Sequence, residues 1–299
     1  MKWVKQAVHY YCEDTRSGRF LGNGVCAAIL DSGAVPHPDL RSQITAFRDF
    51  TDSGLRDDSG HGTHVAGILA GNGRLSSGAY SGMAPHSRLL ICKVLDRHGN
   101  GSTENVLHAI DWLISIRSRY SLRVVNISVG ARPELDSHQK HLLLNAVEEL
   151  WDLGLVVVVS SGNYGPAPGS VAVPGSSPKI ITVGVPDSPA LIQRQYARLN
   201  YSGRGPTEDC VIKPDVFAPG TGIVSCNSAY PRTSFHPYIS KTGTSMATPI
   251  VSGAIVCLLS KYPDLTNVEV KLQLRNSCVP TPGTESGWGL LHVANLMTL

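Results

Sequence analysis

The 299-residue sequence has little excess charge and no long apolar run. Lysine and arginine number 26 against 23 acidic residues, which gives a net charge of only +3, and no basic run occurs. We therefore expect no nucleic-acid partner. The longest apolar stretch, residues 250–259, is far shorter than the roughly 20 residues that cross a bilayer, so we expect no membrane partner either.

The sequence also lacks a secretory signal pattern and any CxxC pair. The opening segment MKWVKQAVHYYCED contains no apolar core and no small-residue cleavage site. Several cysteines lie in apolar runs, where a free thiol behaves as a small hydrophobe. We therefore expect reduced thiols and a cytoplasmic location, with a secreted protein that has lost its targeting and pro-segments as the alternative. The seven cysteines are Cys12, Cys26, Cys92, Cys210, Cys226, Cys257 and Cys278.

Short apolar runs rich in valine and isoleucine alternate with longer segments of helical period. Ser102 or Thr103 is expected to cap one helix, and Gly154 to end another. Near-continuous apolar strands that alternate with helices are typical of a parallel sheet covered on both faces. We therefore predict an α/β fold with a doubly wound, mostly parallel central sheet and helices on both faces. The predicted strands are residues 24–30, 88–95, 122–130, 155–162 and 179–185.

The chain shows no linker, internal repeat or low-complexity segment. We predict a single domain over residues 1–299, with residues 1–21 as an N-terminal extension that packs on it. Residues 186–240 are richer in glycine, proline, serine and threonine, and are expected to form loops and short antiparallel strands at the edge. We expect a monomer, with an oligomer as an open alternative.

Candidate functional residues follow the predicted strands, because ligands bind beyond the carboxyl ends of such strands. Asp31 directly follows the strand 24–30, although an aspartate there serves equally well as a turn former. His61 and His64 lie at the start of a predicted helix in SGHGTHVAGILAG. The positive end of a helix dipole favours a neutral imidazole, which suits a general base.

A zinc site at these histidines is disfavoured by their spacing. Zinc hydrolases with paired helical histidines place them four residues apart with a glutamate between them, whereas His61 and His64 are three apart with no glutamate. We therefore assign no metal ligand. Taken alone, His61 and His64 could equally be residues that cap and pack the start of the helix.

Two further segments supply the other parts of a nucleophilic site. Ser245, in KTGTSMATP, is predicted at a strand-to-helix transition where small neighbours leave its hydroxyl open. A serine hydroxyl needs a base to take its proton and an acid to orient that base, and Asp31, His61 and Ser245 supply these parts. Asn163, in SSGNYGP, follows a predicted strand. Its side-chain amide could stabilise an oxyanion, or the residue could serve only to form a turn with a left-handed backbone conformation.

Together these segments resemble the subtilisin family of serine proteases, and its intracellular bacterial members in particular. AILDSG is similar to the acid motif, GHGTHVAG to the histidine motif, SSGNYGP to the oxyanion asparagine motif and GTSMATP to the nucleophile motif, in the family's order. The resemblance covers about residues 22–291. It implies a subtilisin-like fold and a serine endopeptidase that forms an acyl-enzyme.

The resemblance also implies a role for each residue. Ser245 would attack the scissile carbonyl, His61 would accept its proton, Asp31 would orient the imidazole, and Asn163 would bind the oxyanion. His64 would be the second, structural histidine of its motif. Polypeptide substrates would pair with backbone segments in the manner of an added strand, and we expect broad specificity with an apolar or aromatic residue before the cleaved bond. The residues expected to bind substrate are Gly99, Asn100, Gly101, Ser128, Val129, Gly130, Ser160, Ser161 and Gly162.

The implied chemistry needs no cofactor. Family members often bind calcium at the position of Asp39, in HPDL, but the facing loop GNGRLSSGAYSG differs from the usual calcium loop. A structural calcium ion is therefore an open alternative that we do not assign. Two other functions compete with the protease: a peptide-binding pseudoprotease, which predicts a substituted catalytic residue, and an esterase or amidase that uses the same residues.

Overall fold

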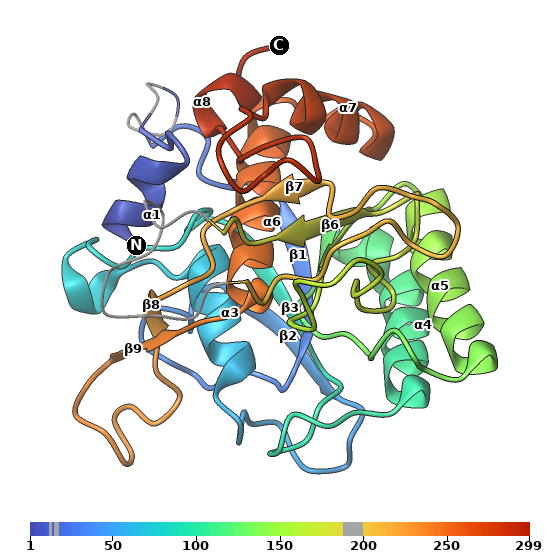
Figure 1. Ribbon diagram of the computed structural model, residues 1–299. Coiled ribbons are helices and arrows are strands. Elements are labelled where there is room, and N and C mark those ends of the chain that lie inside the picture. The colour runs from blue at the N-terminus through green and yellow to red at the C-terminus, as the bar shows by residue number, and fades with distance from the viewer. Residues whose placement is uncertain (12–13, 15–17, 188–199) are drawn as a thin grey trace.

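The centre of the molecule is a seven-stranded sheet in which all neighbouring strands are parallel (Figure 1). The computed structural model describes residues 1–11, 14, 18–187 and 200–299. The strand order is β2-β3-β1-β4-β5-β6-β7, so the chain adds β2 and β3 on one side of β1 and the later strands on the other. The strands are β1 Cys26–Asp31, β2 Ile44–Asp49, β3 Arg88–Lys93, β4 Leu122–Ile127, β5 Val156–Ser160, β6 Ile181–Gly184 and β7 Val216–Phe217.

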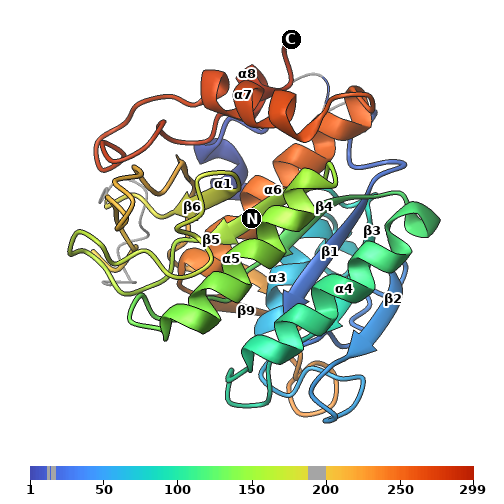
Figure 2. The ribbon, with the colours of Figure 1, turned by 90° about the vertical axis from the view of Figure 1, so that its right-hand side faces the viewer.

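Helices cover both faces of this sheet. The pair α4 and α5 packs on one face, and α3 and α6 pack together on the other (Figure 2). This arrangement confirms the predicted doubly wound α/β fold. The helices are α1 Lys2–Ala7, α3 His61–Ala70, α4 Thr103–Tyr120, α5 Ser137–Asp152, α6 Thr244–Lys261, α7 Asn267–Ser277 and α8 Val293–Leu296, with the short 3₁₀-helix η1 at Arg74–Ser76.

The central strands are apolar throughout because both of their faces are covered. All residues of β1, β5 and β6 are buried, and four consecutive valines form most of β5. Each fully buried aliphatic side chain of this size stabilises the fold by about 1.5–3 kcal/mol relative to exposure. The predicted strands therefore occur where the apolar runs placed them, with β4 ending at Ile127 so that residues 128–130 leave the sheet.

Some elements differ from the sequence prediction. The edge strand β2 was not predicted, because its ITAFRD sequence is only half-buried and carries charged residues. Helix α5 begins at Ser137, earlier than its apolar residues indicated, because Asp136 accepts a hydrogen bond from the Gln139 N–H and caps it.

The segment 186–240 contributes both to the edge and to the main sheet. Strand β8 (Ile223–Cys226) pairs antiparallel with β9 (Tyr238–Lys241), as expected for this region, whereas β7 joins the parallel sheet. Residues 188–199 of this segment lie outside the described residues.

Helix α6, which carries Ser245, is almost completely buried. Its length and composition would suit a membrane span, but 83% of its 18-residue window is buried inside the protein. Its apolar side chains contact α3 and the strands β4, β5 and β6. The helix therefore behaves as a core element, and its first turn is fixed rigidly against the sheet.

A segment near the N-terminus packs against a segment near the C-terminus. Val4 and Val8 of the N-terminal segment are buried in the core, and the Val293 N–H donates a hydrogen bond to the Val8 carbonyl. The ring of His9 stacks on that of His292 with centroids 4.2 Å apart. Cys26, Cys92, Cys210, Cys226 and Cys278 form no disulfide bond within the described residues, and Cys12 lies outside them.

Candidate active site

Asp31 and His61 form a close pair at the carboxyl end of the central strand β1. Asp31 is the last residue of β1 and is completely buried, and its Oδ1 accepts a hydrogen bond from His61 Nδ1 at 2.7 Å. Because a carboxylate can only accept, this contact places the proton on Nδ1 and leaves Nε2 as the proton acceptor. The Ser32 N–H donates to the same Oδ1 at 2.7 Å and holds the carboxylate in place.

Burial and charge act on His61 in opposite directions. Burial lowers the pKa of the His61 imidazole, but the charge of Asp31 and its hydrogen bond raise it, with the result that the pKa lies above the ordinary value of 6.5. The Lys241 ammonium opposes this rise, and the Asp57 carboxylate adds to it. The pair is therefore arranged to stabilise the imidazolium that forms when His61 accepts a proton.

The first turn of α3, which carries His61, is held by an aspartate that the sequence analysis missed. Asp57 Oδ2 accepts hydrogen bonds from the Thr63 N–H at 2.8 Å and the Thr63 hydroxyl at 2.6 Å, and its Oδ1 accepts from the Gly60 N–H at 2.7 Å. The Ser32 hydroxyl donates to Asp57 at 2.8 Å and accepts from the Gly62 N–H at 2.9 Å. An aspartate three residues before a glycine-rich helix start is the signal that could have predicted this cap.

His64 lies one turn further along α3 and is completely buried. Its Nε2 donates to the carbonyls of Ile223 and Ile239 at 3.0 and 3.1 Å, which ties α3 to the β8–β9 hairpin. Burial lowers its pKa to about 3, so it stays neutral where His61 titrates. Its contacts are with the scaffold, as expected for the second histidine of the motif.

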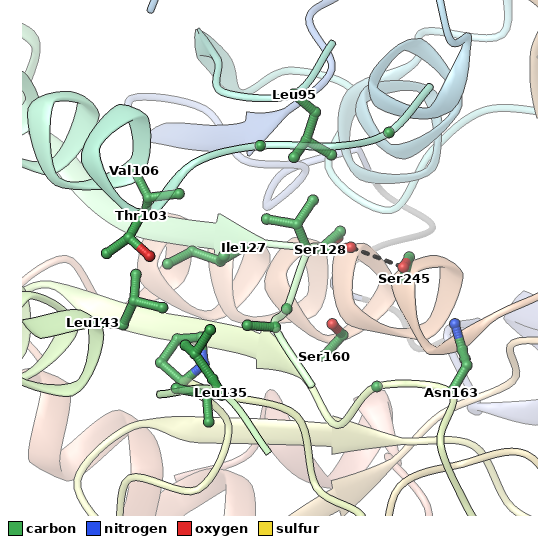
Figure 3. A pocket seen from close by; sticks show the side chains of 18 of the residues that line it. Leu95, Thr103, Val106, Ile127, Ser128, Leu135, Leu143, Ser160, Asn163 and Ser245 are labelled. Carbon is green, nitrogen blue, oxygen red and sulfur yellow. Dashed lines mark hydrogen bonds between the residues drawn. The ribbon is translucent and has the colours of Figure 1, made fainter. Parts of the chain in front are cut away.

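Ser245 is the second residue of α6 and opens onto the same region. Its hydroxyl donates a hydrogen bond to the Ser128 carbonyl at 2.8 Å (Figure 3). No hydrogen bond joins the His61 and Ser245 side chains within the described residues. Rotation about the Cα–Cβ bond of Ser245 would release the Ser128 carbonyl and redirect the hydroxyl.

Asn163 is held in one orientation by the start of α6. Its Oδ1 accepts hydrogen bonds from the Thr244 N–H at 3.0 Å and from the Thr244 hydroxyl at 3.2 Å. These two donors fix which end of the amide is the oxygen, and Figure 3 shows the amide nitrogen pointing toward the side of the cavity that holds Ser245. The Nδ2 protons are therefore directed to where a reacting carbonyl oxygen would lie.

The side chains of His61, Asn163 and Ser245 line a single cavity of about 630 Å³. His61, Ser245 and Asn163 line one part of it, and Figure 3 shows an apolar group of side chains at its other end. None of the described residues that line the cavity is Asp, Glu, Lys or Arg. The residues of this apolar end, which the sequence analysis did not identify, are Val106, Ile127, Leu135 and Leu143, and Leu95 lines the cavity between the two ends.

Most of the predicted substrate-binding residues line this cavity, and two do not. Ser161 is completely buried, and its hydroxyl contacts the Ser202 hydroxyl at 3.2 Å instead of the cavity. Asn100 forms the exposed end of a turn whose backbone bonds with Asp96, and it does not line the cavity. The predicted residues that do line it are Gly99, Gly101, Ser128, Val129, Gly130, Ser160 and Gly162.

Asp39, the residue considered for calcium, has surroundings that do not fit that ion. Its Oδ1 accepts a hydrogen bond from the Leu75 N–H at 3.0 Å, and its Oδ2 accepts from the Tyr238 hydroxyl at 2.6 Å. Calcium requires six or more oxygen ligands, of which the Asp39 carboxylate can supply at most two. The neighbouring side chains, His37 and Cys226, offer nitrogen and sulfur.

With this geometry in place, sequence comparison identifies the family. A sequence model of the subtilase family matches residues 22–289, and the chain therefore belongs to the subtilase family. Among solved structures, it is similar to the S41 psychrophilic protease, at 29% identity and a TM-score of 0.75, covering 91% of this chain and 92% of that one. It is also similar to a cold-adapted subtilisin-like serine proteinase, at 27% identity and a TM-score of 0.72, covering 92% and 90%.

Curated relatives include proteins longer than this chain. The chain is 38% identical over 282 residues to serine protease AprX of Bacillus subtilis, an alignment that covers 88% of this chain but only 63% of the relative. It is 32% identical over 272 residues to subtilisin Savinase of Lederbergia lenta, an alignment that covers 91% of this chain and 90% of the relative. The chain thus spans less than two thirds of the length of AprX and nearly all of Savinase.

Proposed function

We propose that the protein is a serine endopeptidase that cleaves polypeptides through an acyl-enzyme. The observation that carries this proposal is the 2.7 Å Asp31–His61 hydrogen bond at the rim of a cavity also lined by Ser245 and Asn163. None of these four residues is substituted relative to the family motifs, which argues against a pseudoprotease. Membership of the subtilase family supports the same activity.

In the proposed first step, Ser245 attacks the carbonyl carbon of the scissile peptide bond. The hydroxyl turns from the Ser128 carbonyl toward His61 Nε2, which takes its proton as the new C–O bond forms. Asp31 keeps the imidazole in the tautomer with Nδ1 protonated and stabilises the resulting cation. His61 then gives the proton to the amine nitrogen as the C–N bond breaks. In the second step His61 takes a proton from water, which attacks the ester carbon, and returns it to Ser245 as the bond to the acyl group breaks.

The negative oxygen that develops on the carbonyl requires donors that are already oriented. Asn163 Nδ2 supplies one, because the Thr244 donors hold its oxygen on the other side. The backbone N–H of Ser245, in the first turn of α6, supplies a second donor at the positive end of the helix dipole. Fixed donors of this kind contribute about 3–4 kcal/mol each to transition-state stabilisation.

An extended peptide would bind across the cavity by backbone pairing. Within the described part of the chain, the backbone groups of Gly101, Val129 and Gly130 make no hydrogen bonds with protein partners, so they are available to a substrate strand. The uncharged lining and the apolar end of the cavity favour apolar or aromatic substrate side chains.

Two substitutions test the proposed roles. Ser245→Ala should lower kcat on casein by about a million-fold, and Asn163→Leu by about a hundred- to a thousand-fold, the losses known for the equivalent changes in subtilisin. Thr103→Ser, at the far end of the cavity, is a matched control that should retain most activity. Undiminished casein cleavage by purified Ser245→Ala would overturn the proposal, and cleavage of small esters without casein would favour an esterase.

The proposed specificity has a separate test. Peptides that differ only in the residue before the cleaved bond should give kcat/KM values for Phe and Leu at least about tenfold above those for Lys and Glu, because no lining charge would pair with a buried ion. Steady-state kinetics on the four peptides measure this. A preference for Lys would contradict the proposed specificity and leave the endopeptidase proposal intact.

A further inference from the structure

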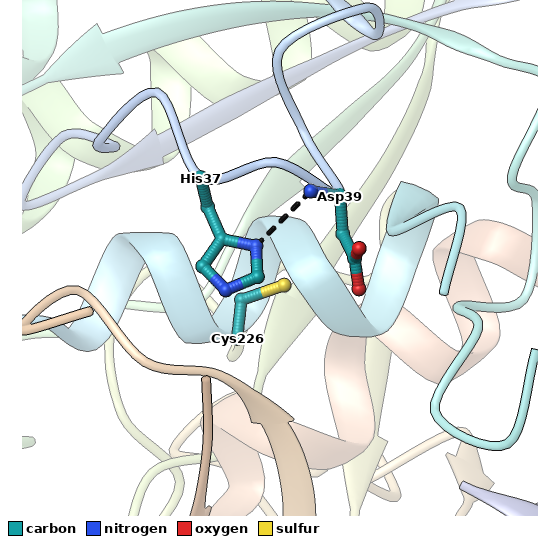
Figure 4. A group of neighbouring side chains, drawn as sticks. All are labelled: His37, Asp39 and Cys226. Carbon is teal, nitrogen blue, oxygen red and sulfur yellow. Dashed lines mark hydrogen bonds between the residues drawn. The ribbon is translucent and has the colours of Figure 1, made fainter. Parts of the chain in front are cut away.

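A second cluster of reactive side chains lies outside the cavity of the proposed active site. His37 and Asp39 come from the loop that follows β1, and Cys226 is the last residue of β8 (Figure 4). One donor atom from each residue lies within 4.8 Å of the other two. The three residues are only 1%, 0% and 2% exposed, so the protein has brought an imidazole, a carboxylate and a thiol together in its interior.

The hydrogen bonds of His37 define which of its nitrogens is unprotonated. Nε2 lies 3.0 Å from the Pro237 carbonyl, and because a carbonyl only accepts, Nε2 carries the proton. Nδ1 therefore has the lone pair, and it accepts from the Asp39 N–H at 3.1 Å. Figure 4 shows Nδ1 on the side of the ring that faces Asp39. A ring N–H bonded to a backbone carbonyl, with the opposite nitrogen unprotonated, is typical of metal-binding histidines.

Asp39 is also positioned by outer partners. The Leu75 N–H and the Tyr238 hydroxyl each donate to one of its oxygens, and each oxygen retains a second lone pair. Carboxylates that bind metals are commonly held by hydrogen bonds of this kind. The cluster thus has a set of inner donors and a set of residues that orient them.

The identity of the donors selects the kind of ion. One nitrogen, one sulfur and one carboxylate oxygen are ligands of zinc, whereas calcium requires six or more oxygens. We propose that His37, Asp39 and Cys226 bind a divalent cation that accepts a thiolate ligand, with Zn²⁺ as the expected occupant. Three protein ligands leave the fourth position of a tetrahedral ion to water.

Binding would require small, local rearrangements. Zinc bonds of about 2.0–2.3 Å place tetrahedral ligands about 3.3–3.8 Å apart, so the donors must draw together from their present separations of up to 4.8 Å. His37 Nδ1 exchanges the Asp39 N–H for the metal, and the Cys226 thiol loses its proton to solvent. No oxidation or reduction takes place.

The bound ion would join two segments that carry parts of the proposed active site. The loop with His37 and Asp39 follows β1, which ends in Asp31, and β8 belongs to the hairpin that precedes Ser245. Helix α3 packs tightly against the same strand, since a Cβ built on Gly67 would lie 2.8 Å from Cys226 Sγ. The ion would therefore stabilise the fold around the site without touching the substrate.

A Cd²⁺ titration tests the proposal directly, because a Cd–thiolate bond gives a near-ultraviolet charge-transfer band. The titration uses the reduced 299-residue chain carrying Ser245→Ala, to prevent self-digestion, and Cys12→Ser and Cys210→Ser, to remove two other thiols. We expect one band that saturates at one Cd²⁺ per chain and disappears in Cys226→Ala. Cys92→Ala, which removes another buried thiol, is the matched control and should retain the band.

A second variant tests the site without removing a ligand. Tyr238→Phe deletes only the hydroxyl that orients Asp39 and should weaken Cd²⁺ binding about ten- to a hundredfold. Zinc X-ray absorption of the parent chain should show one sulfur and one imidazole ligand, which keeps the test valid if Cys226→Ala does not fold. No saturable band in the parent chain, or a band that survives in folded Cys226→Ala, would overturn the proposal.

Discussion

At the scale of single residues, the hydrogen bonds of Asp31, His61 and Ser245 describe a resting arrangement. The acid and the imidazole are joined, while the serine hydroxyl donates to the Ser128 carbonyl. Catalytic hydrogen bonds are often incomplete without substrate and form only in the reacting complex. A substrate that pairs with residues 128–130 would compete for that carbonyl and release the hydroxyl toward His61.

The pH dependence of the reaction follows from the His61 pKa, which Asp31 raises against the effect of burial. The proposed mechanism requires neutral His61, so activity should fall as the pH drops through this raised pKa. Asp31→Asn removes the charge, so the acidic limb of the kcat/KM profile should move to lower pH, with kcat reduced about 10⁴-fold. Profiles of both enzymes measure the shift.

Asp58→Asn is the control for that experiment. Asp58 lies in the loop before α3 and pairs with Arg56, so its loss should leave the acidic limb in place. An acidic limb that Asp31→Asn does not move would contradict the assignment of His61 as the base.

The sequence was sufficient to propose the reacting residues but not to find those that hold them. The Ser32 hydroxyl donates one hydrogen bond to Asp57, 25 residues further along the chain, and only the folded chain shows that the two residues fix the start of α3. Ser161 could have been excluded from the sequence, because alternate residues of a strand face opposite sides and Ser160 faces the cavity. Cys226 lies far along the chain from His37 and Asp39, so no spacing rule could predict their cluster.

At the scale of elements, α3 depends on a histidine that must remain neutral. Burial and the charge of Lys241 lower the His64 pKa from 6.5 to about 3, so between these values the unfolded chain binds a proton that the folded chain does not. The contribution of neutral His64 to the free energy of unfolding is therefore fully present above pH 6.5, and it decreases as the pH falls below this value. Titration of this residue should lower the free energy of unfolding by about 1.4 kcal/mol for each pH unit of decrease below 6.5.

Urea unfolding of the inactive Ser245→Ala protein between pH 7 and pH 4 measures this effect. Exchanging His64 for Gln keeps a donor for the Ile223 and Ile239 carbonyls and removes the titration, so the variant should show the shallower pH dependence. His108→Gln, on the exposed side of α4, should behave as the parent. Equal slopes in the parent and the His64 variant would contradict this account.

The sequence predicted those strands that are buried on both faces, because such strands consist almost entirely of apolar residues. Strands β1 and β5 are enclosed on both faces, so their apolar runs stand out in the sequence. The edge strand β2 is half-exposed, and β7 has only two residues, so neither produces a recognisable pattern. Their pairing depends on the neighbouring strand, which the sequence alone does not supply.

At the scale of the whole molecule, the thermal stability of the protein should show whether the cluster of His37, Asp39 and Cys226 prefers Zn²⁺ or Ca²⁺. Addition of Ca²⁺ to chelator-treated protein should leave Tm unchanged, because the other two donors of the cluster are nitrogen and sulfur, which calcium does not prefer. Zn²⁺ should raise Tm by several degrees, since a ligand that binds only the folded state adds to its stability. Differential scanning fluorimetry of the Ser245→Ala protein checks both, and stabilisation by calcium alone would reverse the assignment.

The position of Ser245 at the start of the enclosed helix α6 links activity to global folding. In the proposed mechanism, a copy that loses the packing of α6 also loses the position of its nucleophile, so an unfolded molecule can be cleaved but cannot cleave another. During heating, the intact copies would digest the opened ones. The rate of inactivation should then rise with enzyme concentration, and dilution alone should prolong the working life of the preparation.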